Sequence, residues 1–276
     1  MKIVKHSGNI VEFKREKLRD SLLKSGASRS IVEDVISQIE KQLYEGISTK
    51  KIYKLAFGLL KKNANSHAAR YNLRAAIQLL GPAGFFFEKY IAKLFQSEGY
   101  ETLTNLLLQG KCVSHEVDVV VRKNSYLTMI ECKFHAGRDA VSDVKVPMYI
   151  LSRFNDLKTQ NLAIFEEDNV LDNCFIITNN RFTADAIQFA RCSNISLLSW
   201  DYPDNENLRD KIDRSQLYPV TCLTTLTLAE KDRLMNVGII LVKELLEDTD
   251  CLKSIDLSQS RVKNVIREAS ELCKYI

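Results

Sequence analysis

Apolar and polar residues alternate over the first dozen positions and then recur at helical spacing. Ile3, Val11 and Phe13 lie on either side of Ser7-Gly8-Asn9, a composition suited to a tight turn, so we expect a two-strand hairpin. From residue 16 to about residue 77, leucine, isoleucine and valine recur every three to four positions, which predicts a series of amphipathic helices. Gly26 and Gly46 are expected at helix ends.

The densest group of helix-breaking residues is Gly81-Pro82-Ala83-Gly84, which predicts a domain boundary. An amphipathic helix is expected over residues 85–98, ended by Gly99. The pattern then predicts strands at 100–108, 115–122 and 127–134, a helix at 141–154, a strand at 173–178, a helix capped by Thr183, and a strand at 195–199. This order, α-β-β-β-α-β-α-β, predicts an α/β domain.

A third part follows a polar stretch that begins after Asp201-Tyr202-Pro203-Asp204 and is expected to be loop-like as far as Pro219. Helical periodicity then continues to the C-terminus, and Thr227 with Glu230 forms a capping-box pattern. The fold class is therefore multidomain α+β. We expect a mostly helical domain at 1–82, an α/β domain at 83–204 and a small helical domain at 218–276.

Composition narrows the function only slightly. Formal charge is +4 and the pI is near 8.6, which permits contact with an acidic polymer without requiring it. The seven cysteines include no CxxC pair, so neither a zinc ribbon nor a disulfide framework is expected. No apolar run approaches the roughly 18 residues that cross a bilayer. We expect a cytoplasmic protein that does not contact a membrane.

Two neighbouring predicted strands carry the candidate chemistry. Asp118 interrupts a valine-rich strand, and Glu131 and Lys133 are two residues apart, hence on one face of the next strand. Phosphodiester hydrolysis uses oxygen ligands for a Mg²⁺-type ion and a nearby cation, and these three residues supply both. The same pattern also fits a surface ion pair on an edge strand with an aspartate at a strand end.

The wider setting resembles the restriction-endonuclease-like superfamily of PD-(D/E)xK nucleases, and most closely its Mrr-type restriction endonucleases, over residues 85–200. The similar features are Phe87-Glu88, Glu98-Gly99-Tyr100, Val117-Asp118-Val119, Glu131-Cys132-Lys133 and the segment 177–183.

This resemblance implies that Asp118 and Glu131 bind the metal together with the Cys132 carbonyl, and that Lys133 positions the attacking water. Glu88 would be an auxiliary catalytic carboxylate, although a solvated glutamate on a helix fits equally well. Asn179 and Arg181 would contact DNA, or would simply cap the following helix.

The N-terminal part resembles the ATP-cone regulatory domain of ribonucleotide reductases and their transcriptional repressor. The similar features are Val4-Lys5, Gly8, Phe13, Lys17 and the segment 68–74. The resemblance implies binding of ATP or dATP through Lys5, His6, Phe13 and Lys17, with the lysines on the phosphates. His6 stands where many ATP-cones have arginine. A helical bundle with solvated lysines is the alternative.

The C-terminal part resembles a helix-hairpin-helix module, with Gly238 between two helices. In such modules, backbone N–H groups of the hairpin contact DNA phosphates. A helical unit for dimerisation or partner docking fits the same pattern.

Together these features predict a nucleotide-regulated, Mg²⁺- or Mn²⁺-dependent DNA endonuclease, with ATP or dATP as the regulatory ligand and with homo-oligomerisation left open. No GxxxxGK[ST] motif is present, so the nucleotide would be sensed rather than hydrolysed by a P-loop. The alternatives are a non-catalytic ATP-sensing DNA-binding protein and an ATP-cone regulator, although the repressors of that type carry a zinc ribbon.

Overall fold

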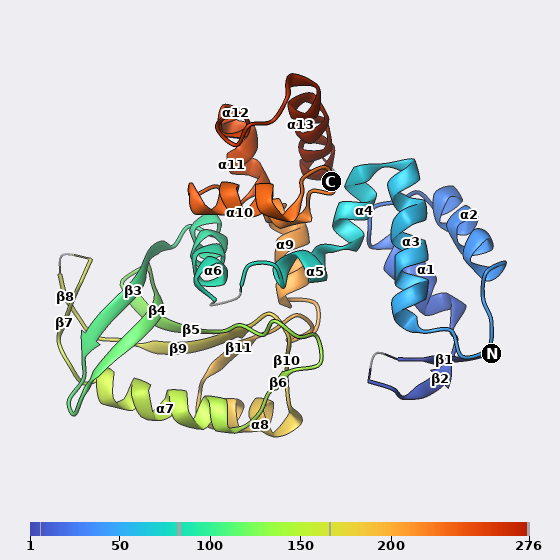
Figure 1. Cartoon of the computed structure of the whole chain (residues 1–276). Coiled ribbons are helices and arrows are strands. Elements are labelled where there is room, and N and C mark those ends of the chain that lie inside the picture. Colours follow the sequence, from blue (N-terminus) through green and yellow to red (C-terminus); the bar gives the residue numbers. More distant parts are fainter. Residues whose placement is uncertain (6, 82–83, 166, 275–276) are drawn as a thin grey trace. The chain divides into compact units, whose positions relative to one another are not determined.

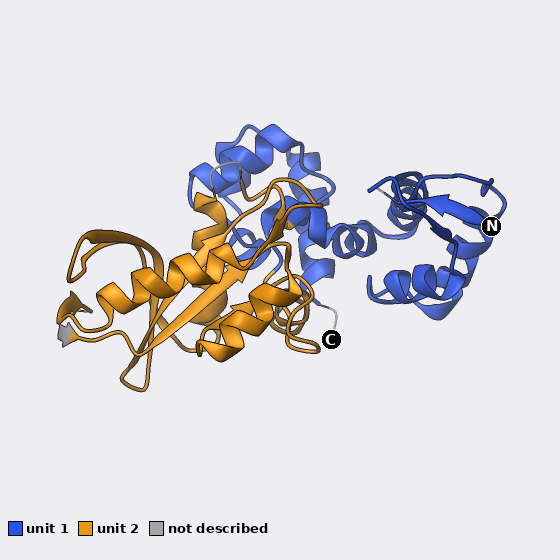
Figure 2. Cartoon of the chain, turned by 90° about the horizontal axis from the view of Figure 1, so that it is seen from below, with its two compact units in different colours: residues 1–76, 218–276 blue, residues 77–217 orange. Residues whose placement is uncertain are grey.

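The chain forms two units, and the first of them combines both ends of the sequence (Figure 2). In the computed structural model, residues 1–5, 7–81, 84–165 and 167–274 are described; His6, Pro82 and Ala83 lie outside them. Unit 1 comprises residues 1–76 and 218–276, and unit 2 comprises residues 77–217. The predicted fold class is confirmed, because a helical N-terminal region, a central sheet and a C-terminal helical region follow one another.

The N-terminal segment of unit 1 begins with the expected hairpin, in which Lys2–Val4 (β1) pairs antiparallel with Ile10–Glu12 (β2). Five helices follow: Arg15–Leu23 (α1), Arg29–Glu40 (α2), Thr49–Asn63 (α3), Asn65–Tyr71 (α4) and Leu73–Ile77 (α5) (Figure 1). The side chains of Ser28 and Ser48 cap α2 and α3. Leucine, isoleucine and valine side chains from the hairpin and the helices pack together into one buried core.

The C-terminal segment of unit 1 consists mainly of helices. It contains the 3₁₀ turn Val220–Cys222 (η1), then Leu228–Asn236 (α10), Val242–Glu247 (α11), Cys251–Ser254 (α12) and Gln259–Cys273 (α13). Hydrogen bonds join it to the N-terminal segment: the Thr221 hydroxyl donates to the Ala76 carbonyl at 2.8 Å, Lys61 Nζ donates to the Thr224 carbonyl at 3.1 Å, and Ser66 donates to Glu271 at 3.4 Å. Residues far apart in the sequence therefore complete one unit.

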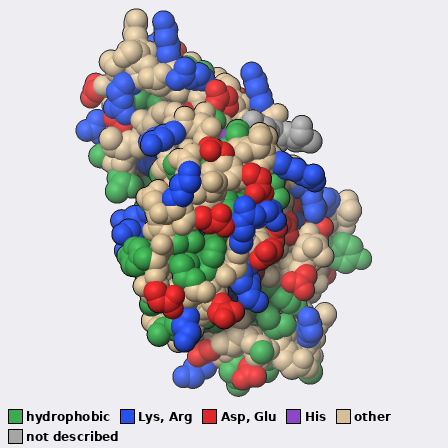
Figure 3. All heavy atoms as spheres, turned by 90° about the vertical axis from the view of Figure 1, so that its right-hand side faces the viewer, with side chains coloured by type: hydrophobic (Ala, Val, Ile, Leu, Met, Phe, Trp, Pro, Cys, Tyr) green, Lys and Arg blue, Asp and Glu red, His purple; other side chains and the backbone are tan. Residues whose placement is uncertain are grey.

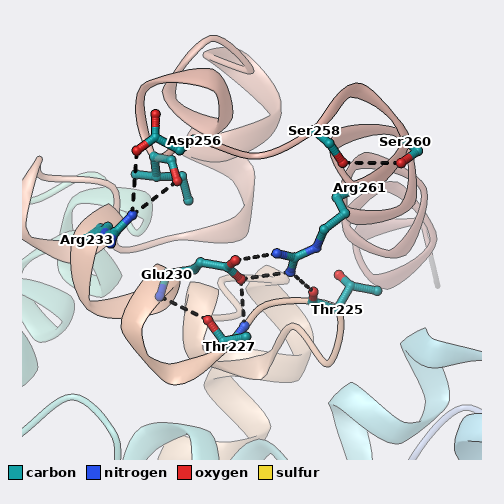
Figure 4. Close-up of polar contacts among 9 residues, drawn as sticks. Thr225, Thr227, Glu230, Arg233, Asp256, Ser258, Ser260 and Arg261 are labelled. Carbon is teal, nitrogen blue, oxygen red and sulfur yellow. Dashed lines mark hydrogen bonds and ion pairs between the residues drawn. The ribbon is translucent and has the colours of Figure 1, made fainter.

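An ion pair connects two of these C-terminal helices (Figure 4). Both terminal nitrogens of Arg261, on α13, donate to the carboxylate of Glu230, on α10, and one of them also donates to the Thr225 carbonyl. The Glu230 carboxylate in turn accepts from the backbone N–H of Thr227, which confirms the predicted capping box. The pKa of Glu230 falls to about 2, chiefly because Arg261 donates hydrogen bonds to its charged form.

Unit 2 is built on a five-stranded sheet in the order β11-β9-β5-β4-β3. The strands are Glu101–Gln109 (β3), Ser114–Lys123 (β4), Tyr126–Lys133 (β5), Asn173–Thr178 (β9) and Ser196–Leu198 (β11). β3, β4 and β5 are antiparallel neighbours, whereas β9 is parallel to both β5 and β11. Lys145–Leu157 (α7) and Ala184–Cys192 (α8) lie on one face of the sheet, and Phe85–Ser97 (α6) lies on the other (Figure 1).

Most of the predicted elements of unit 2 are confirmed, and two predictions are wrong. The helix expected from residue 141 begins only at Lys145, because Val141–Ser142 (β6) pairs in parallel with Arg181–Phe182 (β10). The stretch expected to be a loop before Pro219 contains a helix, Leu208–Ser215 (α9), capped by Asn207. A short hairpin, Leu162–Ile164 (β7) with Glu167–Asn169 (β8), was not expected from the sequence.

The surface carries both signs of charge. On the face shown in Figure 3, lysine and arginine side chains are interspersed with aspartate and glutamate. Charge distribution on that face therefore does not outline a single basic stripe for a nucleic acid. Within the described ranges, no helix has the length and apolar character needed to span a membrane.

The Arg261–Glu230 pair should stabilise unit 1 at neutral pH. Because the pKa of Glu230 is lowered in the folded state, this stabilisation is present above the ordinary glutamate pKa and is lost as the pH falls towards 2. We expect Arg261→Ala to reduce the free energy of unfolding by about 1 kcal/mol at pH 7, since the Arg261 side chain is 40% exposed. The difference from wild type should shrink between pH 5 and pH 2.

Urea unfolding, followed by circular dichroism at several pH values, measures this difference. Arg267→Ala is the matched control, because Arg267 is exposed on the same helix and donates to Asn264. An Arg261→Ala effect that stays constant from pH 7 to pH 3 would contradict the assignment of the stabilisation to this ion pair.

Candidate functional site

The candidate site lies where the pairing between β4 and β5 ends. Their ladder runs from Lys123–Tyr126 to Val119–Ile130. The next residues along, Asp118 and Glu131, occupy facing positions just beyond the last pair, as the alternation of both strands requires. Because the ladder has ended, the backbone N–H of Cys132 donates to the Asp118 carboxylate, at 2.7 Å, instead of to a strand carbonyl.

Asp118 is a partly buried carboxylate in a strand of buried valines. Its pKa rises to about 6, first because burial disfavours the charged form and then because Glu131 is a nearby negative charge. The hydrogen bond from the Cys132 N–H opposes this rise. The carboxylates of Asp118 and Glu131 thus place negative charge in a partly buried site, and a cation would compensate that charge.

Glu131 is 4% exposed and is bonded to two cations, one at each carboxylate oxygen. Lys133 Nζ lies 2.5 Å from Oε1, and Arg153 Nη1 lies 2.6 Å from Oε2. Arg153 belongs to α7 and also donates to the backbone carbonyl of Glu116 on β4. The sequence-predicted residues Glu131 and Lys133 therefore meet as expected for one strand face, whereas Arg153 reaches them from a distant segment.

Glu88 reaches the same site from the first turn of α6. The preceding residue, Phe87, packs its ring 5.7 Å from that of Phe134, which directly follows Lys133 in the sequence. Gly81 allows the Phe134 ring to approach the chain there, because a Cβ atom at Gly81 would lie 2.1 Å from that ring. Burial raises the pKa of Glu88 to about 7, and repulsion from Asp118, Glu116 and Glu131 adds to the rise.

Asn179 and Asn180 are fully buried. The Asn179 amide accepts from the His135 N–H and donates to the His135 carbonyl, both at 2.8 Å. The Asn180 amide donates to the carbonyls of Gly137 and Ala140. These amides hold the segment that follows Lys133. A contact from Asn179 to DNA would break both of its hydrogen bonds, so we do not propose one.

Arg181, the other residue expected to contact DNA in this segment, has a 56% exposed side chain and pairs with Asp201 at 2.8 Å. Helix α8 is capped by the hydroxyl of Thr183, as predicted. Neither Asn179 nor Arg181 is therefore needed as the cap of this helix, and Arg181 remains accessible to an external partner.

Oxygen atoms are the donors that this site offers to a metal ion. In the part of the chain that the structure describes, no group of three or more His, Cys, Asp or Glu side chains is arranged to hold a metal. The Cys132 thiol is also a poor candidate, because burial raises its pKa well above the ordinary value. Two carboxylates and a backbone carbonyl, the set expected from the sequence, suit a Mg²⁺-type ion that keeps several water ligands.

Three of the four residues expected to bind a nucleotide line one cavity of about 420 Å³ in unit 1. Lys5, Phe13 and Lys17 face it, and His6 lies outside the described residues. Apolar walls come from β1, β2, α1 and α3. A volume of this size is in the range of small-molecule sites.

The cavity has further lining residues that the sequence did not single out as ligands: Lys14, Tyr53 and Tyr71. The rings of Tyr53 and Tyr71 are stacked, with centroids 5.0 Å apart and planes at 17°. The Tyr53 hydroxyl donates to the Asn72 side chain. The lining of the cavity therefore combines three lysines with aromatic rings.

Gly238 lies between α10 and α11 with a φ of 91°, as expected for the turn of a helical hairpin. The N–H groups of Ile240 and Leu241, which follow it, both donate to the Glu244 carboxylate at 2.9 Å. These two donors are already satisfied within the protein. The N–H groups of Gly238 and Ile239 also donate within the protein, to the carbonyls of Met235 and Leu234.

Sequence reasoning missed Arg153 in the candidate nuclease site and the two tyrosines in the unit 1 cavity. Arg153 follows no motif; only its position on a helix that packs against the sheet brings it to Glu131. The tyrosines lie on α3 and α4, and their shared orientation depends on how those helices pack. Tertiary contacts rather than local patterns determine all three positions.

The chain matches three protein-family models. Residues 1–76 match the ATP cone domain, residues 82–202 match a restriction endonuclease family, and residues 218–273 match the AF1548-like C-terminal family. Both resemblances seen in the sequence, to Mrr-type restriction endonucleases and to the ATP cone, are confirmed.

Individual proteins are also similar. An uncharacterised protein of Archaeoglobus fulgidus is 32% identical over 183 residues, which are 66% of this chain and 99% of that protein. The crystal structure of AF1548, a protein of unknown function, is similar with 30% identity and a TM-score of 0.57, over 68% of this chain and 97% of that one.

A complex of the MspJI restriction endonuclease with a 27-mer oligonucleotide is only remotely similar. Its identity is 11% and its TM-score is 0.31, over 49% of this chain and 30% of that chain. A similarity this small supports no inference. The first two proteins, in contrast, are matched over nearly their whole length, and the chain therefore belongs to the AF1548-like family, with an ATP cone domain and a restriction endonuclease domain preceding its C-terminal domain.

Proposed function

We propose that the protein is a divalent-metal-dependent DNA endonuclease whose active site comprises Asp118, Glu131, Lys133 and Glu88. The observation that carries this proposal is the apposition of Asp118 with Glu131 at the end of the β4–β5 ladder, with Lys133 on Glu131. The restriction endonuclease family that matches this domain makes a phosphodiester the natural substrate. The sequence-derived parts 1–82, 83–204 and 218–276 would serve as sensor, nuclease and accessory domain.

Asp118, Glu131 and the Cys132 carbonyl would hold Mg²⁺ or Mn²⁺. When bound, such an ion supplies activation of water and compensation of charge on the scissile phosphate. Lys133 would orient the attacking water, because its ammonium lies on the same strand face as Glu131 and is one-third exposed. The family resemblance provides the assignment of these roles, and the geometry is compatible with each of them.

Glu88 would act as an auxiliary carboxylate. Its pKa near 7 means that protonated and charged forms are both accessible near neutral pH. A proton held on Glu88 removes the repulsion between Glu88 and the charged forms of Asp118 and Glu131. The alternative, in which Glu88 is an ordinary solvated glutamate on a helix, is less compatible with its partial burial beside three other acidic residues.

A non-catalytic DNA-binding protein is the second candidate, and one observation favours it. Both oxygens of Glu131 are already paired with cations, Lys133 and Arg153. If those pairs persisted in the presence of metal, the acidic face would be neutralised rather than catalytic. An assay that separates DNA binding from DNA cleavage distinguishes the two functions.

We also propose that the unit 1 cavity binds ATP or dATP and regulates the protein. Lys5, Lys14 and Lys17 would contact the phosphates, and the aromatic and apolar walls would enclose the base. The match to the ATP cone family supports this assignment. DNA contacts through Arg181 and near Gly238 complete the proposal, with phosphates as the chemical group recognised.

Cleavage of supercoiled and branched DNA with Mg²⁺ or Mn²⁺ tests the nuclease function. We expect Glu131→Gln and Asp118→Asn to lower the cleavage rate by roughly a thousandfold, since each removes a charged metal ligand. DNA binding, measured by fluorescence anisotropy in Ca²⁺, should remain within a few-fold of wild type.

Glu101→Gln is the matched control for these variants. Glu101 lies on β3 and pairs with Arg122 away from the site, so its loss should leave cleavage unchanged. A wild-type protein that binds DNA but cleaves none of these substrates with either metal would refute the nuclease function and favour the non-catalytic alternative.

Isothermal titration with ATP and dATP tests the nucleotide site. Loss of one lysine–phosphate contact should weaken binding about tenfold, so we expect that change for Lys17→Ala. Lys24→Ala serves as control, because Lys24 is exposed just beyond the end of α1 and does not line the cavity. Equal affinity of both variants and wild type would show that the nucleotide, if bound, lies elsewhere.

A further inference from the structure

The two cations bound to Glu131 differ in how firmly the protein holds them. Lys133 bonds Oε1 and has a side chain that is 33% exposed, whereas Arg153 bonds Oε2 and is 12% exposed. A lysine on a strand end can withdraw its ammonium into solvent by changing rotamers. The Arg153 guanidinium is less exposed and makes more contacts with the protein.

Arg153 is fixed by further contacts around its guanidinium. Its second terminal nitrogen donates to the backbone carbonyl of Glu116, two residues before Asp118 on β4. The ring of Tyr149, one turn earlier on α7, lies 5.6 Å from the guanidinium. Arg153 thus joins the strand that carries Asp118 to the carboxylate of Glu131 on the neighbouring strand, at the point where the two strands no longer pair.

A buried carboxylate requires compensation of its charge, and a rigid partner also fixes its rotamer. If Arg153 stays in place, it keeps its hydrogen bond to Oε2 of Glu131 and so fixes the orientation of that carboxylate. Oε1 then points to the position that Lys133 now fills. A divalent ion could replace the Lys133 ammonium at Oε1 without disturbing any contact of Arg153.

We propose that Arg153 is a positioning residue that holds Oε2 of Glu131 and links β4 to β5, while Lys133 is the exchangeable cation at Oε1, the oxygen open to a divalent metal ion. This inference rests on the metal site of the proposed function. It assigns different effects on metal affinity to two cations that contact the same carboxylate.

Removing either positive charge makes the site more negative, which by itself favours a divalent cation. Lys133→Ala removes a competitor and should therefore leave metal binding unchanged or tighten it several-fold. Arg153→Ala also releases the Glu131 carboxylate from its fixed orientation, and loss of such a partner typically weakens metal binding by roughly 10- to 100-fold.

Isothermal titration of the full-length protein with Mn²⁺ measures these affinities for wild type, Arg153→Ala, Arg153→Lys and Lys133→Ala. Arg153→Lys keeps the charge but cannot bond both Glu131 and the Glu116 carbonyl with a planar fork, so we expect an intermediate weakening. Arg122→Ala is the matched control; Arg122 lies on β4 and pairs with Glu101. Thermal melting reports whether each variant is folded, and Arg153→Lys carries the test if Arg153→Ala does not fold.

The possible outcomes separate this inference from the function on which it rests. Weaker Mn²⁺ binding by the Arg153 variants, with unchanged or tighter binding by Lys133→Ala, supports it. Equal or tighter binding by a folded Arg153 variant overturns it and leaves the metal site intact. Equal weakening by both Lys133→Ala and the Arg153 variants overturns the exchange at Oε1. Absence of Mn²⁺ binding by wild type refutes the metal site itself, and this inference with it.

Discussion

Charge compensation at Glu131 is the constraint on which the organisation of the nuclease domain depends. Taking a carboxylate out of water costs on the order of several kcal/mol unless a partner with good geometry replaces the solvent. Glu131 meets that requirement through Lys133 on its own strand and Arg153 on α7. The second of these contacts ties α7 to the sheet, in addition to the apolar packing of Ile150 and Leu157 in the domain core.

The same constraint explains why the acidic residues around Glu131 behave differently from one another. Asp118 has a backbone N–H as its polar partner, whereas Glu88 faces mainly other acids. Their pKa values are raised first by burial and then by repulsion from the neighbouring acids. A site of this kind stores unfavourable electrostatic energy in the folded protein, and an arriving cation would release part of it. Perturbed pKa values of this kind cluster at functional sites.

The sequence predicted contacts between residues that are close along the chain and missed contacts between residues that are far apart along it. Asp118, Glu131 and Lys133 lie on consecutive strands of a hairpin, where alternation and register follow from local pattern. The position of Arg153 depends on how α7 packs. The pairing of Val141–Ser142 with Arg181–Phe182 joins segments about 40 residues apart. No local sequence pattern predicts either feature. Helix α9 was missed because only Leu208 and Ile212 among its residues are buried and apolar.

The assembly of unit 1 from both ends of the chain has a consequence for the order of folding. The Ala76 carbonyl accepts from Thr221, so the chain leaves unit 1 and returns to it at adjacent points. Joining the two segments closes a loop that contains residues 77–217, at an entropic cost of about 4 kcal/mol if that loop is an unfolded coil. Prior folding of unit 2 shortens the effective loop and removes most of that cost. During synthesis, α10 to α13 also leave the ribosome after unit 2. Unit 1, although it contains residues that precede unit 2 in the sequence, is therefore completed after unit 2.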